Sequence, residues 1–353
     1  MELPTTAWQG VELEQRLAWA RRWMRRTAAA AERLPDLTSV RLAVTAHLDL
    51  KSALFLRAYR SAGAAVIVHP ADPATTRADV QRLVETWGIE VTDPAACVDW
   101  EPTHTVEMGG DIVVEAAARG YGGIVAGLEM TRTGLNRVAE LALTYPVFDL
   151  DGVPLKNQLH NRFTVGTSTW HTVTARTQLS LHGLAVLVVG YGEVGAGLAR
   201  TARGLGAIVQ VAEVDPGRAL IASYDGFDVV DLAGDRADIV VTATGRTGTV
   251  SAEVIAGLKD GCLLVNAGHS ADELDLDALG NGKELLPGVT SHRVGGREIL
   301  LFAGGHVANL AAGDGDSLNA FDVTAALIVD SAGWLVAHGN EFPAGMHPYP
   351  GPS

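Results

Sequence analysis

The chain has 353 residues, of which 47% are hydrophobic and 19% are charged. This length exceeds the size at which a single hydrophobic core usually stops growing, so we expect two domains. The formal net charge of −14 argues against a nucleic-acid partner, because such proteins gather positive charge against phosphates. Cys97 and Cys262 are too few for a disulfide framework or a clustered metal site, which suits a reducing compartment.

Targeting signals are not evident in the sequence. The first residues lack the basic and apolar regions of a signal peptide, and no apolar run approaches the roughly 18 residues of a membrane span. We therefore expect a cytoplasmic protein that contacts no membrane and binds no metal.

The first half of the chain predicts one helix followed by alternating strands and helices. Apolar residues recur at helical spacing from about residue 11 to residue 34. A first β-α-β unit follows and carries no phosphate-binding turn. Its strands and helix, and the strands of two further units, are expected at residues 40–45, 50–62, 65–69, 123–126 and 146–149.

The pattern restarts at residue 183. Apolar strands are expected at residues 185–189, 208–212, 228–231, 239–242, 262–266 and 299–302. Two doubly wound α/β domains in tandem, joined near residue 165, account for both halves. The proline-rich residues 346–353 are expected to form a tail.

The strand at residues 185–189 runs directly into Gly190-Tyr-Gly192-Glu-Val-Gly195 and then into a helical stretch. Three glycines at this spacing allow a tight turn, close approach of backbone amides to a pyrophosphate, and close packing of helix on sheet. The next strand leads to Glu213, 23 positions after Gly190, where a carboxylate can accept both ribose hydroxyls of NAD. Arg218 is the nearby cation that an NADP site would use, but Glu213 would repel a 2′-phosphate. An unrelated glycine turn is the alternative.

Several further segments match the pattern of one family. They are Lys156-Asn-Gln-Leu-His-Asn161, Val241-Thr-Ala-Thr-Gly245, Val265-Asn-Ala-Gly-His269 and His306-Val-Ala-Asn-Leu310. With these motifs the chain resembles the adenosylhomocysteinase (S-adenosylhomocysteine hydrolase) family, as a divergent member. The resemblance covers nearly the whole chain and is most specific over residues 156–310.

The resemblance implies a substrate domain over residues 1–165, an NAD-binding domain over 166–312, and a segment over 313–353 that returns to the substrate domain with a truncated tail. It also implies a homo-oligomer. In the family, bound NAD oxidises the 3′ carbon of a nucleoside, and the ketone acidifies the 4′ C–H. The 5′ substituent is then eliminated, water adds, and the ketone is reduced again.

Roles for individual residues also follow from the resemblance. The implied catalytic residues are Lys156, His47, Asn161 and His269, and we expect His160, a departure from the family pattern, to be catalytic as well. The implied NAD-binding residues are Gly190, Gly192, Glu193, Val194, Gly195, Glu213, Arg218, Thr131, Arg132, Thr133, Thr244, Ala267, Gly268 and Asn309. The implied substrate-binding residues are Glu129 and Asp111, and we expect Asp49 and Asp314, which replace family residues around the base, to bind substrate too.

Departures from the family pattern concern the substrate. His160, Met108 and Met130 stand where the family has carboxylates, and Asp49 with Lys51 replaces side chains that hold adenine. We therefore expect another nucleoside substrate and an NAD-dependent lyase, a dehydratase in nucleoside antibiotic biosynthesis. The alternatives are an S-adenosylhomocysteine hydrolase, a catalytically inactive NAD-binding regulatory protein, and a simple hydroxy-acid dehydrogenase.

Overall fold

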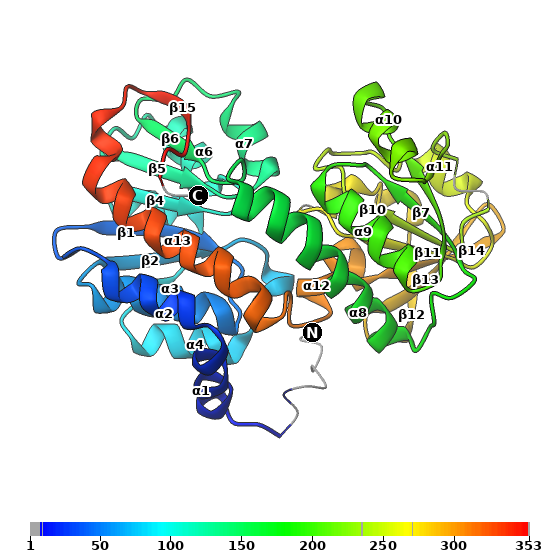
Figure 1. Cartoon of the computed structure of the whole chain (residues 1–353), viewed down its shortest axis with the longest axis horizontal. Helices are drawn as coiled ribbons and strands as arrows, with labels where there is room; N and C mark the ends of the chain where they lie inside the picture. The colour runs from blue at the N-terminus through cyan, green and yellow to red at the C-terminus, as the bar shows by residue number, and fades with distance from the viewer. Residues whose placement is uncertain (1–7, 9, 234–235, 270, 352–353) are drawn as a thin grey trace. The chain divides into compact units, whose positions relative to one another are not determined.

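The computed structural model describes residues 8, 10–233, 236–269 and 271–351, which form two compact units. One unit contains the described residues up to Asn157 together with those from Leu318 onward. The other spans Gln158–Ser317. Each unit is a mainly parallel sheet flanked by helices (Figure 1), which confirms the predicted α/β fold class with two doubly wound sheets.

The first unit contains a parallel sheet in the order β15-β6-β5-β4-β1-β2-β3. Its inner strand β1 is buried along nearly its whole length, because helices cover both faces of a parallel sheet. The strands are β1 (Arg41–Ala46), β2 (Ala65–Pro70), β3 (Glu90–Val91), β4 (His104–Glu107), β5 (Ala126–Glu129), β6 (Pro146–Asp149) and β15 (Gly345–Pro348).

Three helices of this unit, α3, α5 and α7, begin at a capping side chain. Asp49 accepts the backbone N–H groups of Lys51 and Ser52 and thereby starts α3. The segment expected to be one helix over 11–34 is two helices, because the backbone leaves helical geometry at Met24 (φ −102°, ψ 60°). The helices are α1 (Leu13–Trp23), α2 (Arg25–Arg33), α3 (Leu50–Ser61), α4 (Ala78–Thr86), α5 (Pro94–Asp99), α6 (Asp111–Arg119), α7 (Arg132–Val138) and α13 (Leu318–His338).

The long helix α13 corrects one expectation. It belongs to a segment, Leu318–Glu341, that is long and apolar enough to cross a membrane, with a mean hydropathy of 1.5 in its most apolar window. In the structure 61% of that window is buried, and α13 packs against α2 and α3 (Figure 1). An apolar helix of this kind is the core helix of its unit.

Two strands of the first sheet also differ from expectation. Residues 345–348, expected to belong largely to the tail, form β15 and pair in parallel with β6. Strand β5 begins at Ala126, three residues after the expected start, because Gly122 and Gly123 lie before it in irregular structure.

The second unit contains a sheet in the order β12-β13-β14-β11-β10-β7-β8-β9. Strands β14 to β9 run parallel, and β12 with β13 adds an antiparallel ribbon that the sequence pattern did not indicate. The strands are β7 (Ala185–Val189), β8 (Ile208–Ala212), β9 (Asp228–Val229), β10 (Ile239–Thr242), β11 (Cys262–Asn266), β12 (Gly282–Leu286), β13 (Val289–Val294) and β14 (Arg297–Phe302). The helices are α8 (Gly166–Thr177), α9 (Glu193–Gly204), α10 (Pro216–Tyr224), α11 (Ala252–Gly257) and α12 (Ala308–Ala311).

Each sheet has one point where the strand order reverses. In the first unit the chain moves outward from β1 to β2 and β3, then returns to β4 on the other side. In the second it moves from β7 to β8 and β9, then returns to β10. Ligands of doubly wound sheets bind at the carboxyl ends of the strands beside such a reversal. The residues that follow β1, β4, β7 and β10 are therefore the first candidates for a site.

Candidate active site

The glycine turn follows β7 and leads into α9, as the sequence predicts. Gly190 has φ 93°, and a Cβ there would lie 2.8 Å from the carbonyl oxygen of Ala243. A Cβ on Gly195 would overlap the carbonyl of Gly190. At Gly192, by contrast, no described atom lies within 4 Å of the position a Cβ would take. The turn is closed on its protein side and open at Gly192, as a pyrophosphate requires.

Glu213 lies just beyond the end of β8, beside this turn. Its carboxylate accepts the backbone N–H groups of Tyr191 at 2.6 Å and Asp215 at 2.8 Å. Arg218 is exposed in the first turn of α10, and its backbone N–H donates to Asp215. The group held against the turn is thus an anion, which suits the ribose hydroxyls of NAD.

The ends of β10 and β11 are joined by a buried carboxylate that the sequence analysis missed. Glu273 is buried and accepts the backbone N–H and hydroxyl of Thr244, each at 2.9 Å, and the backbone N–H of Gly245 at 2.8 Å. Burial raises its pKa. A Cβ on Gly268 would overlap this carboxylate, so Gly268 leaves the space that Glu273 fills.

The segment after β11 contains three of the predicted residues. Asn266, at the end of β11, accepts the backbone N–H of Gly268 at 2.7 Å and donates to the carbonyl of Gly305 at 2.8 Å. Ala267 is buried, and His269 follows at intermediate exposure. Asn266 therefore fixes the backbone from which His269 extends.

Two further NAD-turn residues lie at the start of α9. Glu193 forms an ion pair with Arg162 at 3.1 Å, and Val194 is partly exposed. Arg162 belongs to η3 (Leu155–Val165), an eleven-residue segment with π-helical hydrogen bonding. Segments of this kind are rare and occur frequently at functional sites. Lys156 and Asn161 lie in the same segment at intermediate exposure.

A buried polar chain connects η3 to α12. His160 Nε2 lies 2.5 Å from Asp316 Oδ2. Ser168 Oγ lies 2.6 Å from Asp316 Oδ1, and Asn309 Nδ2 donates to Ser168 Oγ at 2.9 Å. Asn309 Oδ1 is buried and has no hydrogen-bond partner among the described residues. A buried acceptor of this kind requires a donor, and the carboxamide N–H of NAD is one.

The residues of the second unit that the sequence predicts to bind NAD therefore fit the cofactor. They provide a glycine turn that is open at Gly192, the carboxylate of Glu213 at the end of β8, and the buried acceptor Asn309 Oδ1. Asp314, expected to bind substrate, is partly exposed in the loop that follows α12. Its neighbour Asp316, which the sequence analysis did not assign, holds the buried position.

In the first unit, His47 and Asp49 follow β1 at the reversal of the strand order. His47 Nδ1 lies 2.7 Å from Thr75 Oγ1. Asp49 caps α3 and also forms an ion pair with Lys51, whose Nζ lies 2.5 Å from Asp49 Oδ2. Both side chains of this pair are nearly buried. The Asp49–Lys51 ion pair therefore occupies positions that, by the resemblance, contact the nucleobase of the substrate.

Two buried glutamates lie side by side where β4 and β5 end. Glu107 and Glu129 are in register on these strands, and neither is exposed. Glu129 Oε1 accepts the N–H of Gly109 and both donors of Thr131, whereas Oε2 has no partner among the described residues. Burial raises the pKa of Glu107 to about 7. Burial and the neighbouring Glu107 raise the pKa of Glu129 to about 8.

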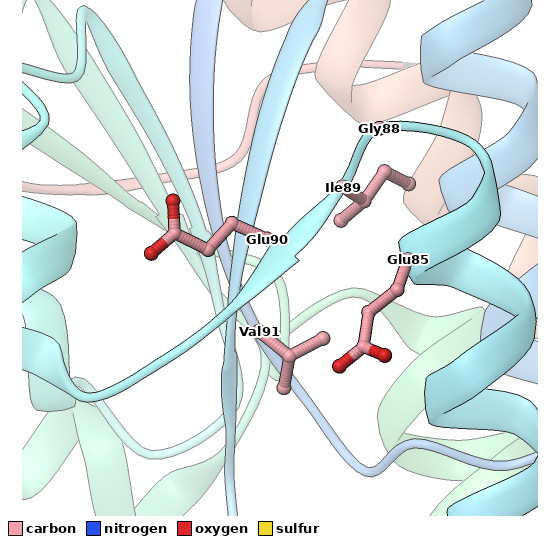
Figure 2. Close-up of a pocket in the computed structure, with 5 residues that line it drawn as sticks. All are labelled: Glu85, Gly88, Ile89, Glu90 and Val91. Atoms are coloured by element: carbon pink, nitrogen blue, oxygen red, sulfur yellow. The ribbon is translucent and has the colours of Figure 1, made fainter.

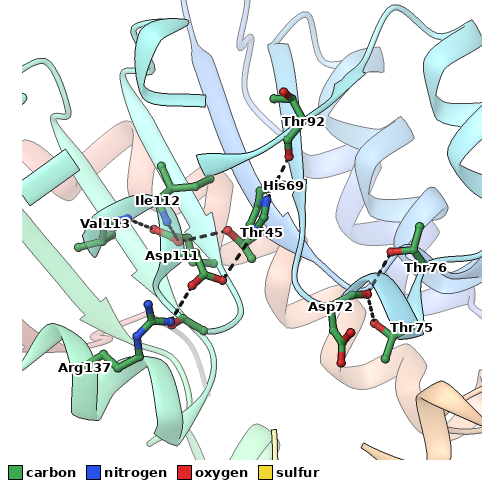
Figure 3. A network of polar contacts seen from close by, with 12 residues as sticks. Thr45, His69, Asp72, Thr75, Thr76, Thr92, Asp111, Ile112, Val113 and Arg137 are labelled. Carbon is green, nitrogen blue, oxygen red and sulfur yellow. Dashed lines mark hydrogen bonds and ion pairs between the residues drawn. The ribbon is translucent and has the colours of Figure 1, made fainter. Parts of the chain in front are cut away.

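The predicted residue Asp111 is already engaged by protein groups. It begins α6 and pairs with Arg137 at 2.7 Å and, more distantly, with His69 at 3.7 Å (Figure 3). His69 Nδ1 also lies 3.0 Å from the carbonyl oxygen of Thr92. This network fixes the loop between β4 and α6.

The loop after β5 carries the remaining predicted residues. Thr131 caps α7 by accepting the backbone N–H of Gly134 at 3.0 Å. Arg132 forms an ion pair with Asp151 at 2.9 Å, and Thr133 is partly exposed.

A surface hollow beside β3 contains none of the predicted site residues. It is lined by Glu85, Gly88, Ile89, Glu90 and Val91 (Figure 2). This hollow lies at the edge strand of the first sheet, away from the reversal of the strand order between β1 and β4.

The fold and the NAD-binding residues define an NAD-dependent enzyme of two α/β units. Residues 161–315 match the family "S-adenosyl-L-homocysteine hydrolase, NAD binding domain". An S-inosyl-L-homocysteine hydrolase of Methanopyrus kandleri is 32% identical over 95% of this chain and 86% of its own length. Adenosylhomocysteinases of Thermococcus kodakarensis and Thermotoga maritima are 33% and 32% identical, over 91% and 92% of this chain and 83% and 87% of theirs. The chain belongs to the S-adenosyl-L-homocysteine hydrolase family, and its cofactor is NAD.

Proposed function

We propose that this enzyme hydrolyses the 5′ thioether of a homocysteine-bearing purine nucleoside through transient oxidation at the 3′ carbon. The observation that carries the proposal is similarity over nearly the whole chain to proteins named S-inosyl-L-homocysteine hydrolase and adenosylhomocysteinase. Those names support the hydrolase alternative better than the expected antibiotic-pathway dehydratase.

NAD, when bound, supplies a hydride acceptor and later returns the hydride. Lys156 takes the proton of the 3′-hydroxyl, a role open to a lysine amine that is partly withdrawn from water. Asn161, one turn further along η3, orients Lys156 or the carboxamide. His47 and His269 donate a proton to the leaving thiolate and accept one from the water that adds at the 5′ carbon.

We also propose that the two units bind different ligands. Residues 166–312 bind NAD, and residues 1–165 together with the returning segment 313–353 bind the nucleoside. Asp49, Glu129, Asp111 and Asp314 are the proposed substrate contacts, with Thr131, Arg132 and Thr133 covering the nicotinamide. We further propose a cytoplasmic homo-oligomer.

Dehydration of a nucleoside without homocysteine is the second candidate. It is favoured by the altered residues of the first unit, where Met108 and Met130 replace family carboxylates and a Lys51–Asp49 ion pair stands at the base positions. Such changes alter which sugar and base bind without removing the elimination chemistry.

A substrate panel followed by mass spectrometry tests both candidates. Purified protein is incubated with S-adenosyl-L-homocysteine, S-inosyl-L-homocysteine and a set of unsubstituted purine nucleosides. Release of homocysteine supports the hydrolase, whereas a loss of 18 mass units from a free nucleoside supports the dehydratase. Turnover of neither class, with NAD still bound, would support a regulatory protein. Lys156→Ala serves as the control for contaminating activity.

A further inference from the structure

The polar chain from His160 to Asn309 contains two residues, Asp316 and Ser168, to which no role has been assigned. Both lie within the second unit, and both are nearly buried, as are His160 and Asn309. Their hydrogen-bonding capacities determine which end of the Asn309 amide faces the cofactor.

Asp316 is the starting point, because a carboxylate only accepts hydrogen bonds. One of its oxygens faces His160 Nε2 and the other faces Ser168 Oγ. The Ser168 hydroxyl also lies 3.0 Å from the carbonyl oxygen of Val165, which is a second acceptor. Whichever of the two receives the single hydroxyl proton, only lone pairs of Ser168 remain for Asn309.

Asn309 must therefore turn its NH₂ group toward Ser168, as the 2.9 Å contact shows. Its carbonyl oxygen then faces the other way, where it is buried and has no partner among the described residues. An amide with the opposite orientation would place its oxygen against the lone pairs of Ser168. The orientation thus depends on Asp316 and not on Asn309 alone.

We propose that Asp316 and Ser168 are positioning residues that fix Asn309 as an acceptor for the carboxamide NH₂ of NAD. Through its second oxygen, Asp316 also holds His160, so one carboxylate orients both the cofactor contact and the histidine that the sequence predicts to be catalytic. The part concerning His160 rests on the proposed function. The part concerning Asn309 rests only on NAD binding.

The test compares NAD with 3-acetylpyridine adenine dinucleotide, which keeps the carbonyl but replaces the NH₂ by a methyl group. Dissociation constants of cofactor-free protein are measured by titration calorimetry without substrate, so failure of the proposed reaction leaves the result unaffected. Leaving a buried acceptor without its donor should weaken binding of the analogue by roughly 5- to 150-fold relative to NAD.

Ser168→Ala and Asp316→Asn remove the constraint in different ways. Alanine gives Asn309 no acceptor to face, and an asparagine NH₂ at 316 can donate to Ser168, whose proton then turns toward Asn309. In both variants we expect the NAD-to-analogue preference to fall at least about fivefold. Ser331→Ala, which truncates a buried serine of α13 in the other unit, should keep the preference of the wild type.

A merely structural role predicts a different result. General loosening of the unit would weaken NAD and the analogue equally and leave their ratio unchanged. An unchanged ratio in folded Ser168→Ala and Asp316→Asn, or no preference in the wild type, would overturn the proposal. Thermal unfolding of each variant establishes that it is folded, and if either fails this check the other decides.

Discussion

The two sheets follow the same winding rule but differ in how they would recognise a ligand. The NAD-binding unit uses backbone geometry: glycines that no side chain can replace, and a strand-end carboxylate fixed by backbone N–H groups. In the other unit, the residues proposed to contact substrate are side chains, including the Lys51–Asp49 ion pair and buried Glu129 of β5. Recognition by the backbone restricts which residues can stand in the turn, so the sequence pattern identifies the cofactor. Side chains at a substrate site can be exchanged more freely, so the same pattern does not identify the substrate.

Gly195→Ala is the variant for which we expect the largest effect, namely loss of bound NAD. A Cβ at this position would overlap the carbonyl of Gly190, so the turn must deform. We expect the purified variant to carry almost no NAD, measured by denaturing the protein and quantifying released nucleotide. Gly204→Ala, in the last turn of the same helix with no described atom within 4 Å, is the matched control and should keep NAD. Full NAD content in Gly195→Ala would mean that the turn is not the pyrophosphate site.

Lys156→Ala should have the next largest effect. Removing a general acid or base costs on the order of 10²- to 10⁴-fold in rate. NAD content should remain that of the wild type, because the glycine turn is untouched. Lys283→Ala, at an exposed position of β12, should leave the rate unchanged. A Lys156→Ala enzyme with near-normal turnover would remove the proton acceptor from the proposed mechanism.

The sequence predicts those parts of the fold and of the candidate site that depend on residues close together in the chain. The glycine turn and Glu213 were predictable, because local spacing determines both. Asp316 was not, since its partner His160 lies 156 positions away and only the folded chain brings them together. Strand β4 was missed because Val106 is the single apolar residue among its four, and β15 was missed because an edge strand that ends in proline resembles a loop. The break at Met24 carries no glycine or proline signal.

His160→Asp tests the buried pair of His160 and Asp316 in the second unit. It places a second carboxylate against Asp316, and like charges in a buried pair are unfavourable. We expect a fall in turnover of at least about tenfold and a lower melting temperature. The double variant His160→Asp with Asp316→His restores an opposite-charge pair and should recover part of both losses. A single variant as active and stable as the wild type would exclude a role for this pair.

The smallest effect concerns the buried glutamates of the first unit. A carboxyl whose folded pKa is raised stabilises the fold below its unfolded value near 4.5, and this contribution is lost as pH rises through the folded value. With folded pKa values of about 7 and about 8, Glu107 and Glu129 should lower stability as the pH rises from about 4.5 to about 8, with no further loss above that. Glu129→Gln, neutral at every pH, should reduce that decline by a few degrees in melting temperature. An identical decline would show that Glu129 is ionised throughout.

The most direct test of the central claim is hydrogen exchange at the 4′ carbon. Purified protein, with no NAD added, is incubated in D₂O with S-adenosyl-L-homocysteine or S-inosyl-L-homocysteine, and the nucleoside is recovered for mass spectrometry and NMR. Transient 3′-oxidation predicts deuterium at the 4′ position while each chain retains its NAD. Absence of exchange, together with a stable ketone and NADH formed in equal amount, would contradict the account and indicate a simple dehydrogenase.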